Sequence, residues 1–320
     1  MRAVRYHEHG GTDVLQVDEI DRPDPGHGEV VVEVAAAGVN PVDTYFREGS
    51  YEPFTLPMIP GCDVAGEVVG VGAGVSAVDA GDPVFATGLG AQHQGTYAEY
   101  VSVPADRLAR LPDGVELVEA GAAGVVAGTA WRALIDHAGL EPAEAALIHG
   151  GSGGVGHAAV QVAAAAGARV LTTASPTYHE RLRELGADVV FDYSRDDLAD
   201  AVREASGGGV DVVLDHRLDD YLQFDADVAA TGARVVGIGE HDPAVGLSDD
   251  GVARSKDVSY QFMSLFNAPR LADILDRLAV LLDRGDLSIE VARTLDLDEA
   301  AEAQRAVLED SFLGKVVLTP

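Results

Sequence analysis

The stretch Ala145-Ala-Leu-Ile-His-Gly-Gly-Ser-Gly-Gly-Val-Gly156 decides the fold of this chain. A short apolar run, typical of a strand, leads into glycines, and an alanine-rich segment typical of a helix follows over Gly154–Gly167. Such glycines allow a tight turn and let backbone N–H groups approach a diphosphate, which the positive end of the helix also attracts. The stretch therefore predicts a dinucleotide-binding turn. A merely flexible turn is the alternative.

Strands and helices are expected to alternate after this turn. The expected strands are Arg169–Ala174, Val189–Phe191, Val210–Leu214 and Arg234–Gly239, and the expected helices are Tyr178–Leu185 and Leu198–Ala205. This alternation predicts a parallel, doubly wound sheet with crossover helices.

The first third of the chain is expected to be rich in β structure, because Gly and Pro separate short β-branched segments. The expected strands there are Val30–Ala37, Val64–Val71, Pro83–Ala86 and Thr96–Val103, and later segments are helices at Val118–Gly139, Arg270–Asp283 and Glu299–Leu308 and a closing strand at Lys315–Leu318. The sequence thus predicts an α/β protein with two domains. A β-rich domain covers residues 1–120 and is completed by about 270–320, and a Rossmann domain covers residues 121–269.

The charge of the chain excludes two classes of partner. There are 53 acidic and 22 basic residues, a net charge of −31, and only Lys256 and Lys315 are lysines. Such a surface repels nucleic acid and anionic lipid. Because the acids spread along the whole chain, we expect a halophilic protein in a salt-rich cytoplasm, where ions screen the repulsion. A protein partner is the alternative explanation.

The cysteine content and the apolar segments bear on the compartment. Cys62 is the one cysteine, which rules out an intramolecular disulfide. We expect it to be a half-buried filler, and a redox role is the alternative. The N-terminal residues MRAVRYHEHGG lack an apolar core of a signal peptide, and other apolar segments are too short or too rich in glycine to span a bilayer. We expect a soluble, cytoplasmic protein that does not contact a membrane.

The end of the second expected strand indicates which dinucleotide binds. An NAD site usually places an acidic residue there, whereas Leu171-Thr-Thr-Ala-Ser175 has none. Ser175 could bond a 2′-phosphate, and His179, Arg181 and Arg183 add positive charge. These residues predict NADPH (NADP) as the cofactor. The two arginines could instead pair with neighbouring glutamates.

Further motifs run from one end of the chain to the other. They are Gly38-Val-Asn-Pro-Val-Asp-Thr-Tyr45, Pro60-Gly-Cys-Asp-Val-Ala-Gly-Glu67, Gly81-Asp-Pro-Val-Phe85, Gly95-Thr-Tyr-Ala-Glu-Tyr100, Gly128-Thr-Ala-Trp-Arg-Ala-Leu134, Leu185-Gly-Ala187 and Gly314-Lys-Val-Val-Leu318. In these motifs the chain resembles the zeta-crystallin-like quinone oxidoreductases, a zinc-independent branch of the medium-chain dehydrogenase/reductase superfamily. The resemblance implies a GroES-like β domain, a Rossmann domain, and a homodimer or homotetramer joined through the edge strands of the Rossmann sheets.

The resemblance also implies roles for individual residues. Asn40, Tyr45 and Tyr51 would line the pocket of a quinone or enone substrate and polarise its carbonyl group. Asn40 could instead be a turn residue, and Tyr45 could be core packing. The residues implied for the cofactor are Thr129 at the nicotinamide, Ser152, Gly153, Gly154 and Val155 at the diphosphate, Ser175 and Arg181 at the 2′-phosphate, Tyr193 at the adenosine, Ile238 and Gly239 at the ribose, and Leu265, Phe266 and Asn267 at the carboxamide.

No metal is expected in the site. Where zinc-dependent relatives carry a Cys, a His-Glu pair and a third ligand, this chain has Asn40, Cys62-Asp63 and Ala123. An asparagine is a poor zinc ligand and an alanine is none.

Three departures from the family pattern leave the substrate open. Tyr178 stands where relatives often have a lysine for the 2′-phosphate, His216-Arg217 replaces small residues, and Glu309–Phe312 lacks a basic residue. We therefore keep three functions. The first is an NADPH:quinone reductase, the second an NADPH-dependent enone or enoyl-thioester reductase, and the third a non-catalytic, crystallin-like cofactor-binding protein.

Overall fold

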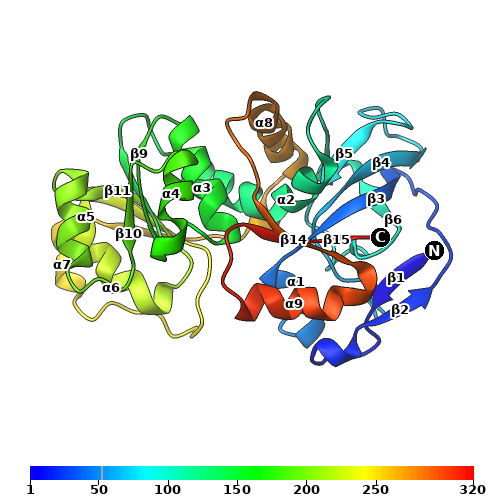
Figure 1. The fold of residues 1–320 in the computed structure, drawn as a ribbon, viewed down its shortest axis with the longest axis horizontal. Helices are drawn as coiled ribbons and strands as arrows, with labels where there is room; N and C mark the ends of the chain where they lie inside the picture. Colours follow the sequence, from blue (N-terminus) through cyan, green and yellow to red (C-terminus); the bar gives the residue numbers. More distant parts are fainter. Residues whose placement is uncertain (52) are drawn as a thin grey trace. The chain divides into compact units, whose positions relative to one another are not determined.

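The computed structural model describes residues 1–51 and 53–320. Their contacts divide the chain into two compact units, shown in Figure 1. Unit 1 consists of Met1–Gly128 and Ala268–Pro320, and unit 2 consists of Thr129–Asn267. The chain therefore leaves unit 1 for unit 2 and returns to complete it.

A mixed sheet forms the centre of unit 1. Among the described residues its strand order is β14-β15-β3-β4-β5-β7, and β6 also pairs with β3. These strands are β3 (Glu29–Val39), β4 (Val64–Val71), β5 (Pro83–Ala86), β6 (Tyr100–Pro104), β7 (Leu108–Arg110), β14 (Val291–Asp296) and β15 (Lys315–Thr319). The closing strand β15 lies antiparallel beside β3, so residues from the two ends of the chain become neighbours.

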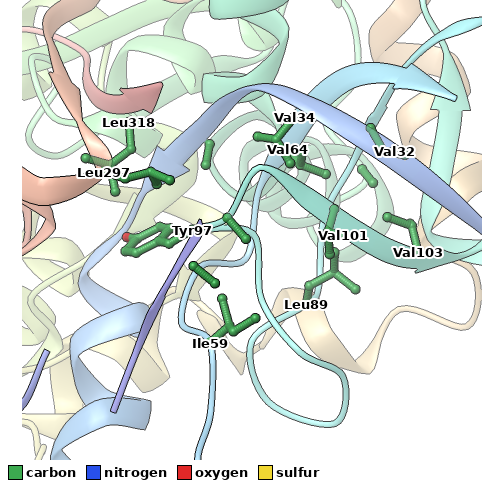
Figure 2. Close-up of a cluster of buried hydrophobic side chains, with 14 of the residues drawn as sticks. Val32, Val34, Ile59, Val64, Leu89, Tyr97, Val101, Val103, Leu297 and Leu318 are labelled. Atoms are coloured by element: carbon green, nitrogen blue, oxygen red, sulfur yellow. The ribbon is translucent and has the colours of Figure 1, made fainter. Parts of the chain in front are cut away.

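The helices and the remaining strands of unit 1 surround this sheet. They are β1 (Arg2–Arg5), β2 (Gln16–Glu19), α1 (Pro41–Glu48), α2 (Leu117–Trp131), which runs on into unit 2, α8 (Leu271–Arg284) and α9 (Ala300–Glu309). The core is aliphatic, and Figure 2 shows Val34, Val64, Leu297 and Leu318 packed near the ring of Tyr97. A glycine is needed inside β4, because a Cβ at Gly66 would lie 1.9 Å from the carbonyl oxygen of Glu33 on β3.

Unit 2 contains a parallel sheet whose described strands run in the order β10-β9-β8-β11-β12-β13. They are β8 (Ala145–Ile148), β9 (Arg169–Ala174), β10 (Val189–Asp192), β11 (Val210–Asp215), β12 (Ala229–Gly237) and β13 (Ser259–Phe262). The helices are α3 (Gly154–Ala165), α4 (His179–Glu184), α5 (Leu198–Ser206), α6 (Leu218–Val228) and α7 (Asp250–Ser255). The strand order reverses between β8 and β11. In such sheets a ligand binds at the carboxyl ends of the strands beside this point.

Several elements differ from the sequence prediction. The expected strand Thr96–Val103 begins only at Tyr100, because the backbone N–H groups of Thr96 and Tyr97 donate to Pro60 outside the ladder. The expected helix Val118–Gly139 is α-helical to Trp131 and continues as a π-helical segment, Arg132–His137. The structure adds helices and strands that the sequence analysis did not predict: α1, α6, α7, β1, β2, β7, β13 and β14. None of the helices in the described residues has both the length and the apolar character needed to cross a bilayer.

Candidate active site

The glycine turn joins β8 to α3 and is fastened to the neighbouring strand β9. The Gly151 N–H donates to the Thr173 carbonyl oxygen at 2.8 Å, and the Gly150 N–H donates to the Thr173 hydroxyl at 3.1 Å. Gly153 precedes the helix in an extended conformation and stands at its positive end. The turn therefore presents backbone N–H groups at the carboxyl edge of the sheet, as an anion site requires.

The glycines of the turn differ in the space that a Cβ atom would find at each position. A Cβ at Gly156 would lie 2.1 Å from the Gly150 carbonyl oxygen, and one at Gly151 would lie 2.2 Å from the Thr172 hydroxyl. At Gly153 the nearest atom would be the Gly150 oxygen, at 3.3 Å. Gly151 and Gly156 are thus fixed by packing inside unit 2, whereas Gly153 leaves room outside the turn that a ligand can use.

The end of β9 brings together two of the predicted cofactor residues. The hydroxyl of Ser175 lies 3.4 Å from the hydroxyl of Tyr193, whose side chain is 54% exposed. Arg181 forms an ion pair with Glu184 at 2.7 Å, as the alternative interpretation of this arginine supposed. The imidazole of His179 lies 3.0 Å from the Ala174 carbonyl oxygen. Basic residues therefore follow Ser175, but Arg181 is already paired with Glu184 and His179 already contacts a carbonyl oxygen.

The remaining predicted cofactor residues of unit 2 lie on three segments. The Ile238 N–H donates to the Asp215 carbonyl oxygen at 2.8 Å, and the Gly239 carbonyl accepts the Leu218 N–H at 3.1 Å, so the ends of β11 and β12 are tied together. Thr129 is nearly buried on α2. Leu265, Phe266 and Asn267 form one short 3₁₀ turn, in which Leu265 is buried.

The two bulky residues after β11 have separate surroundings. The ring of His216 lies against the glycine turn, since a Cβ at Gly150 would stand 2.6 Å from its Cε1 atom. Arg217 forms an ion pair with Asp220 in the first turn of α6. The bulk at His216 therefore adjoins the turn itself, and the Arg217 guanidinium is paired with α6.

A buried acid cluster that the sequence analysis missed lies beneath the turn. His149 Nε2 is 2.8 Å from Asp225 Oδ1, and the imidazole stacks on the ring of Tyr221 at 4.5 Å between centroids. Burial lowers the pKa of His149 to about 4. Burial and the nearby Asp225 raise the pKa of Asp215 to about 7, and burial also raises that of Asp225. Both shifts favour the protonated, neutral form of these acids. Asp225 lies on α6, a helix that the sequence analysis did not predict, so nothing in the sequence placed it beside His149.

A second polar cluster lies inside unit 1 and contains Asn40. The Asn40 amide N–H donates to Asp63 Oδ2 at 2.8 Å, and its oxygen accepts from Lys315 Nζ at 2.6 Å. The Asn40 backbone N–H donates to Asp43 Oδ2 at 2.9 Å, which holds the first turn of α1. All four residues are at most 3% exposed. Neither Lys315 nor Asp43 was assigned a role from the sequence, although both lie within quoted motifs, Gly314–Leu318 and Gly38–Tyr45.

Burial sets the protonation of this cluster. It raises the pKa of Asp63 to about 6, although the Lys315 ammonium acts in the opposite direction. It also raises the pKa of Cys62 well above the usual range, so the thiol stays protonated. Cys62 is completely buried, so the expectation of a half-buried residue is wrong. It stands on the segment that leads into β4, where the core covers it on all sides.

The predicted tyrosines are accessible. Tyr45 on α1 is 40% exposed, and Tyr51 just beyond the helix is 59% exposed and packs edge-on against Phe46 at 5.8 Å between centroids. Tyr45 follows Asn40 by five residues, so the buried cluster anchors the helix that carries it. The exposure of Tyr45 disfavours the alternative that its side chain is core packing.

The residues present do not fit a zinc ion. In the described part of the chain, no group of three His, Cys, Asp or Glu side chains is arranged to hold a metal. Ala123 has no donor atom, and the Asn40 oxygen already accepts from an ammonium. A cation here would also meet the positive charge of Lys315.

Domain families match both ends of the chain. Residues 26–113 match the family described as alcohol dehydrogenase GroES-like domain, and residues 185–318 match that described as zinc-binding dehydrogenase. The quinone oxidoreductase of Lama guanicoe is 34% identical, over 99% of this chain and 97% of the relative. A phenolphthiocerol/phthiocerol polyketide synthase protein of Mycobacterium tuberculosis is 33% identical, over 97% of this chain but 14% of that protein.

Solved structures share the whole fold. A structure described as an NAD-dependent alcohol dehydrogenase has a TM-score of 0.92 at 32% identity and covers 100% of both chains. Quinone oxidoreductase of Escherichia coli in complex with NADPH has a TM-score of 0.88 at 30% identity, again over 100% of both chains.

A GroES-like domain combined with a Rossmann sheet defines a medium-chain dehydrogenase/reductase, and the predicted fold class is confirmed. Within that superfamily the chain belongs to the quinone oxidoreductase family, and it is an oxidoreductase. The resemblance read from its motifs is confirmed.

The crowding at the turn predicts opposite results for two glycines. Gly156→Ala should lower the free energy of unfolding by roughly 1–3 kcal/mol, because its Cβ meets backbone that cannot rotate away. Gly153→Ala should cost less than about 1 kcal/mol, since its Cβ meets one atom at a tolerable distance. Urea unfolding of the two variants measures the difference. Equal destabilisation would contradict the packing described for Gly156.

The buried acid cluster predicts a pH dependence of stability. The unfolded Asp215 has a pKa of about 3.9 and the folded one about 7, so the folded protein keeps a proton that the unfolded chain loses between these values. This group's contribution to stability therefore falls as the pH rises through that window. Asp215→Asn should have a higher Tm relative to the wild type at pH values above the window than at values near its acid end. A difference in Tm that does not change with pH would show that Asp215 ionises normally.

Proposed function

We propose that this protein is an NADPH-dependent reductase that transfers a hydride to a quinone-type acceptor without zinc. The observation that carries the proposal is the cluster of Lys315, Asn40 and Asp63. In it, Asn40 and Asp63 stand at positions where zinc-dependent relatives carry metal ligands. They are hydrogen-bonded to each other, and Asn40 also accepts from the buried Lys315 ammonium, so these groups are engaged without a metal. The residues proposed for the dinucleotide belong to unit 2, and those proposed for the acceptor belong to unit 1.

Unit 2 offers residues for each part of NADPH. The open side of Gly153, with Ser152, Gly154 and Val155, would hold the diphosphate at the start of α3. The 2′-phosphate would be bound by Ser175 with Arg181, and the adenosine would be bound by Tyr193. The nicotinamide end would be held by Ile238, Gly239, Thr129 and the turn Leu265–Asn267. The absence of an acid after β9 favours NADPH over NADH. When bound, NADPH supplies the hydride.

The acceptor needs one hydride and one proton to become a hydroquinone. Negative charge builds on its oxygen as the hydride arrives, and a hydrogen-bond donor there lowers the barrier. The hydroxyl groups of the exposed residues Tyr45 and Tyr51 suit this role, and water resupplies a proton that either one gives up. The Asn40 amide already has partners at both ends, so we assign it to orienting α1.

An enone or enoyl-thioester reductase is the second candidate. The similarity to a segment of a polyketide synthase supports it, because the same polar residues could polarise the carbonyl group of an enone. The net charge of −31 counts against an anionic thioester such as a coenzyme A ester. A crystallin-like protein without activity would bind NADPH and reduce none of these acceptors.

The cofactor assignment predicts the effect of a charge at Ser175. Ser175→Asp should weaken NADPH at least about tenfold and strengthen NADH, since a carboxylate repels the 2′-phosphate and accepts from the ribose hydroxyl. Ser248→Asp is the control, because it adds the same charge at an exposed position elsewhere in unit 2. Fluorescence titration with both dinucleotides measures the constants. NADPH preference that survives in Ser175→Asp would mean that the 2′-phosphate lies elsewhere.

The acceptor assignment is tested by turnover. NADPH oxidation is followed in the nicotinamide absorption band with a benzoquinone, a small enone and an enoyl thioester at high KCl. We expect the quinone to give the highest kcat/KM, and Tyr45→Phe to lower kcat about tenfold or more while the Kd of NADPH stays unchanged. Binding of NADPH without turnover of any acceptor would overturn both enzyme assignments. An unchanged kcat in Tyr45→Phe would remove this hydroxyl from the reaction.

A further inference from the structure

The two lysines of this chain stand in different surroundings. Lys256 and Lys315 are the only lysines among 22 basic residues. Both donate to main-chain carbonyl oxygens: Lys256 to two of them in unit 2, each at 2.8 Å, and Lys315 to that of Val39. Only Lys315 is fully buried and also bonds a side chain, the Asn40 oxygen. A buried ammonium thus contacts Asn40, the residue that we assign to orienting α1.

The contact reaches α1 through Asn40. Lys315 holds the oxygen of the amide and Asp63 holds its nitrogen, so the network leaves the amide one orientation. The backbone of Asn40 bonds Asp43 in the first turn of the helix. Because Tyr45 lies on the second turn of the same helix, its position depends on where Asn40 is held.

We propose that Lys315 is a positioning residue for the reduction, which sets the place of α1 and of Tyr45 by holding Asn40. The inference rests on the proposed function, since it needs Tyr45 to face the acceptor. A lysine suits this place because a compact ammonium fits between the Val39 and Asn40 oxygens, whereas a planar guanidinium spreads its donors over a wider fork.

The charges around Lys315 give the proposal a second readout. Asp63, Asp43 and Cys62 are the buried groups that act on the Lys315 ammonium. Two buried tyrosines adjoin Asp43: Tyr97, whose hydroxyl donates to Asp43 Oδ2 at 2.8 Å, and Tyr6. Asp63 also accepts from the Thr87 hydroxyl at 2.6 Å and the Val125 N–H at 2.8 Å, so it cannot turn toward water. Without the ammonium, the Asp63 carboxylate loses its opposing charge, and its pKa rises above the value of about 6.

The test is a double-mutant cycle on the full-length protein with NADPH and a benzoquinone. Lys315→Met, Asn40→Ala and the double variant are compared, with Lys256→Met as the matched control. We expect Lys315→Met and Asn40→Ala each to lower kcat about tenfold or more, and the double variant to be no slower than the worse single variant, because both changes release the same helix. The Kd of NADPH should stay within about twofold of the wild type, and Lys256→Met should keep the wild-type kcat.

The pH profile separates positioning from a loss of stability alone. In Lys315→Met the acid limb of kcat/KM should move to higher pH, and Lys315→Arg should keep that limb near its wild-type place while kcat stays low. Additive losses in the cycle, or an acid limb that does not move, would overturn the proposal.

Two further measurements keep the outcomes distinct. If Lys315→Met does not fold, the variant Lys315→Met/Asp63→Asn takes its place, because it removes the ammonium and its opposing carboxylate together. A wild-type kcat in that double variant would overturn the proposal. The wild-type protein is assayed first. If it reduces neither quinone nor enone, the proposed function fails. If it reduces one of them and the cycle is additive, the positioning role alone fails.

Discussion

Burying the Lys315 ammonium is the constraint on which unit 1 depends. A charge without water is costly unless partners of opposite charge or strong dipoles surround it. Here the Val39 carbonyl, the Asn40 amide and the buried acids provide that environment, and they come from β3, the start of α1 and the approach to β4. The closing strand β15 carries the lysine into this place by pairing with β3. The last strand is therefore joined to the N-terminal part of unit 1 by the hydrogen bonds of the Lys315 ammonium as well as by strand pairing.

The sequence predicts the parts of the fold that local pattern controls. The glycine turn and the strands β4, β5, β8 and β9 fall close to where apolar runs and glycines indicate, because each is a short buried strand with marked ends. The helices α1 and α6 were not predicted. The first starts at Pro41 and depends on Asp43 to accept a backbone N–H, and the second is rich in acids and has a mixed apolar face. The signals for α1, a proline in its first turn and the capping box between Asn40 and Asp43, are local and were missed, whereas α6 has no side-chain cap to mark its start.

The same distinction holds for the candidate site. Asn40, Tyr45 and the turn residues could be found because they lie within motifs, but motifs do not reveal what their side chains bond. The partners Lys315, Asp63 and Asp225 come from remote segments, and a single sequence contains no signal for such pairings. The acidic composition misleads here as well. It indicates solvated carboxylates, and yet Asp43, Asp63, Asp215 and Asp225 are buried.

The fixed lysine also bears on the kind of acceptor that the proposed reaction can use. A zinc ion polarises a carbonyl strongly because it keeps an open coordination position for the substrate oxygen. Lys315 is buried and donates to Val39 and Asn40, so its charge reaches an acceptor only through neutral groups. Neutral donors such as tyrosine hydroxyls stabilise a developing oxyanion less than a metal does. Quinones and enones spread the added charge over a conjugated system and need less help, whereas simple ketones and aldehydes do not spread it. The geometry of unit 1 therefore favours conjugated acceptors over the alcohol–carbonyl chemistry of zinc-dependent relatives.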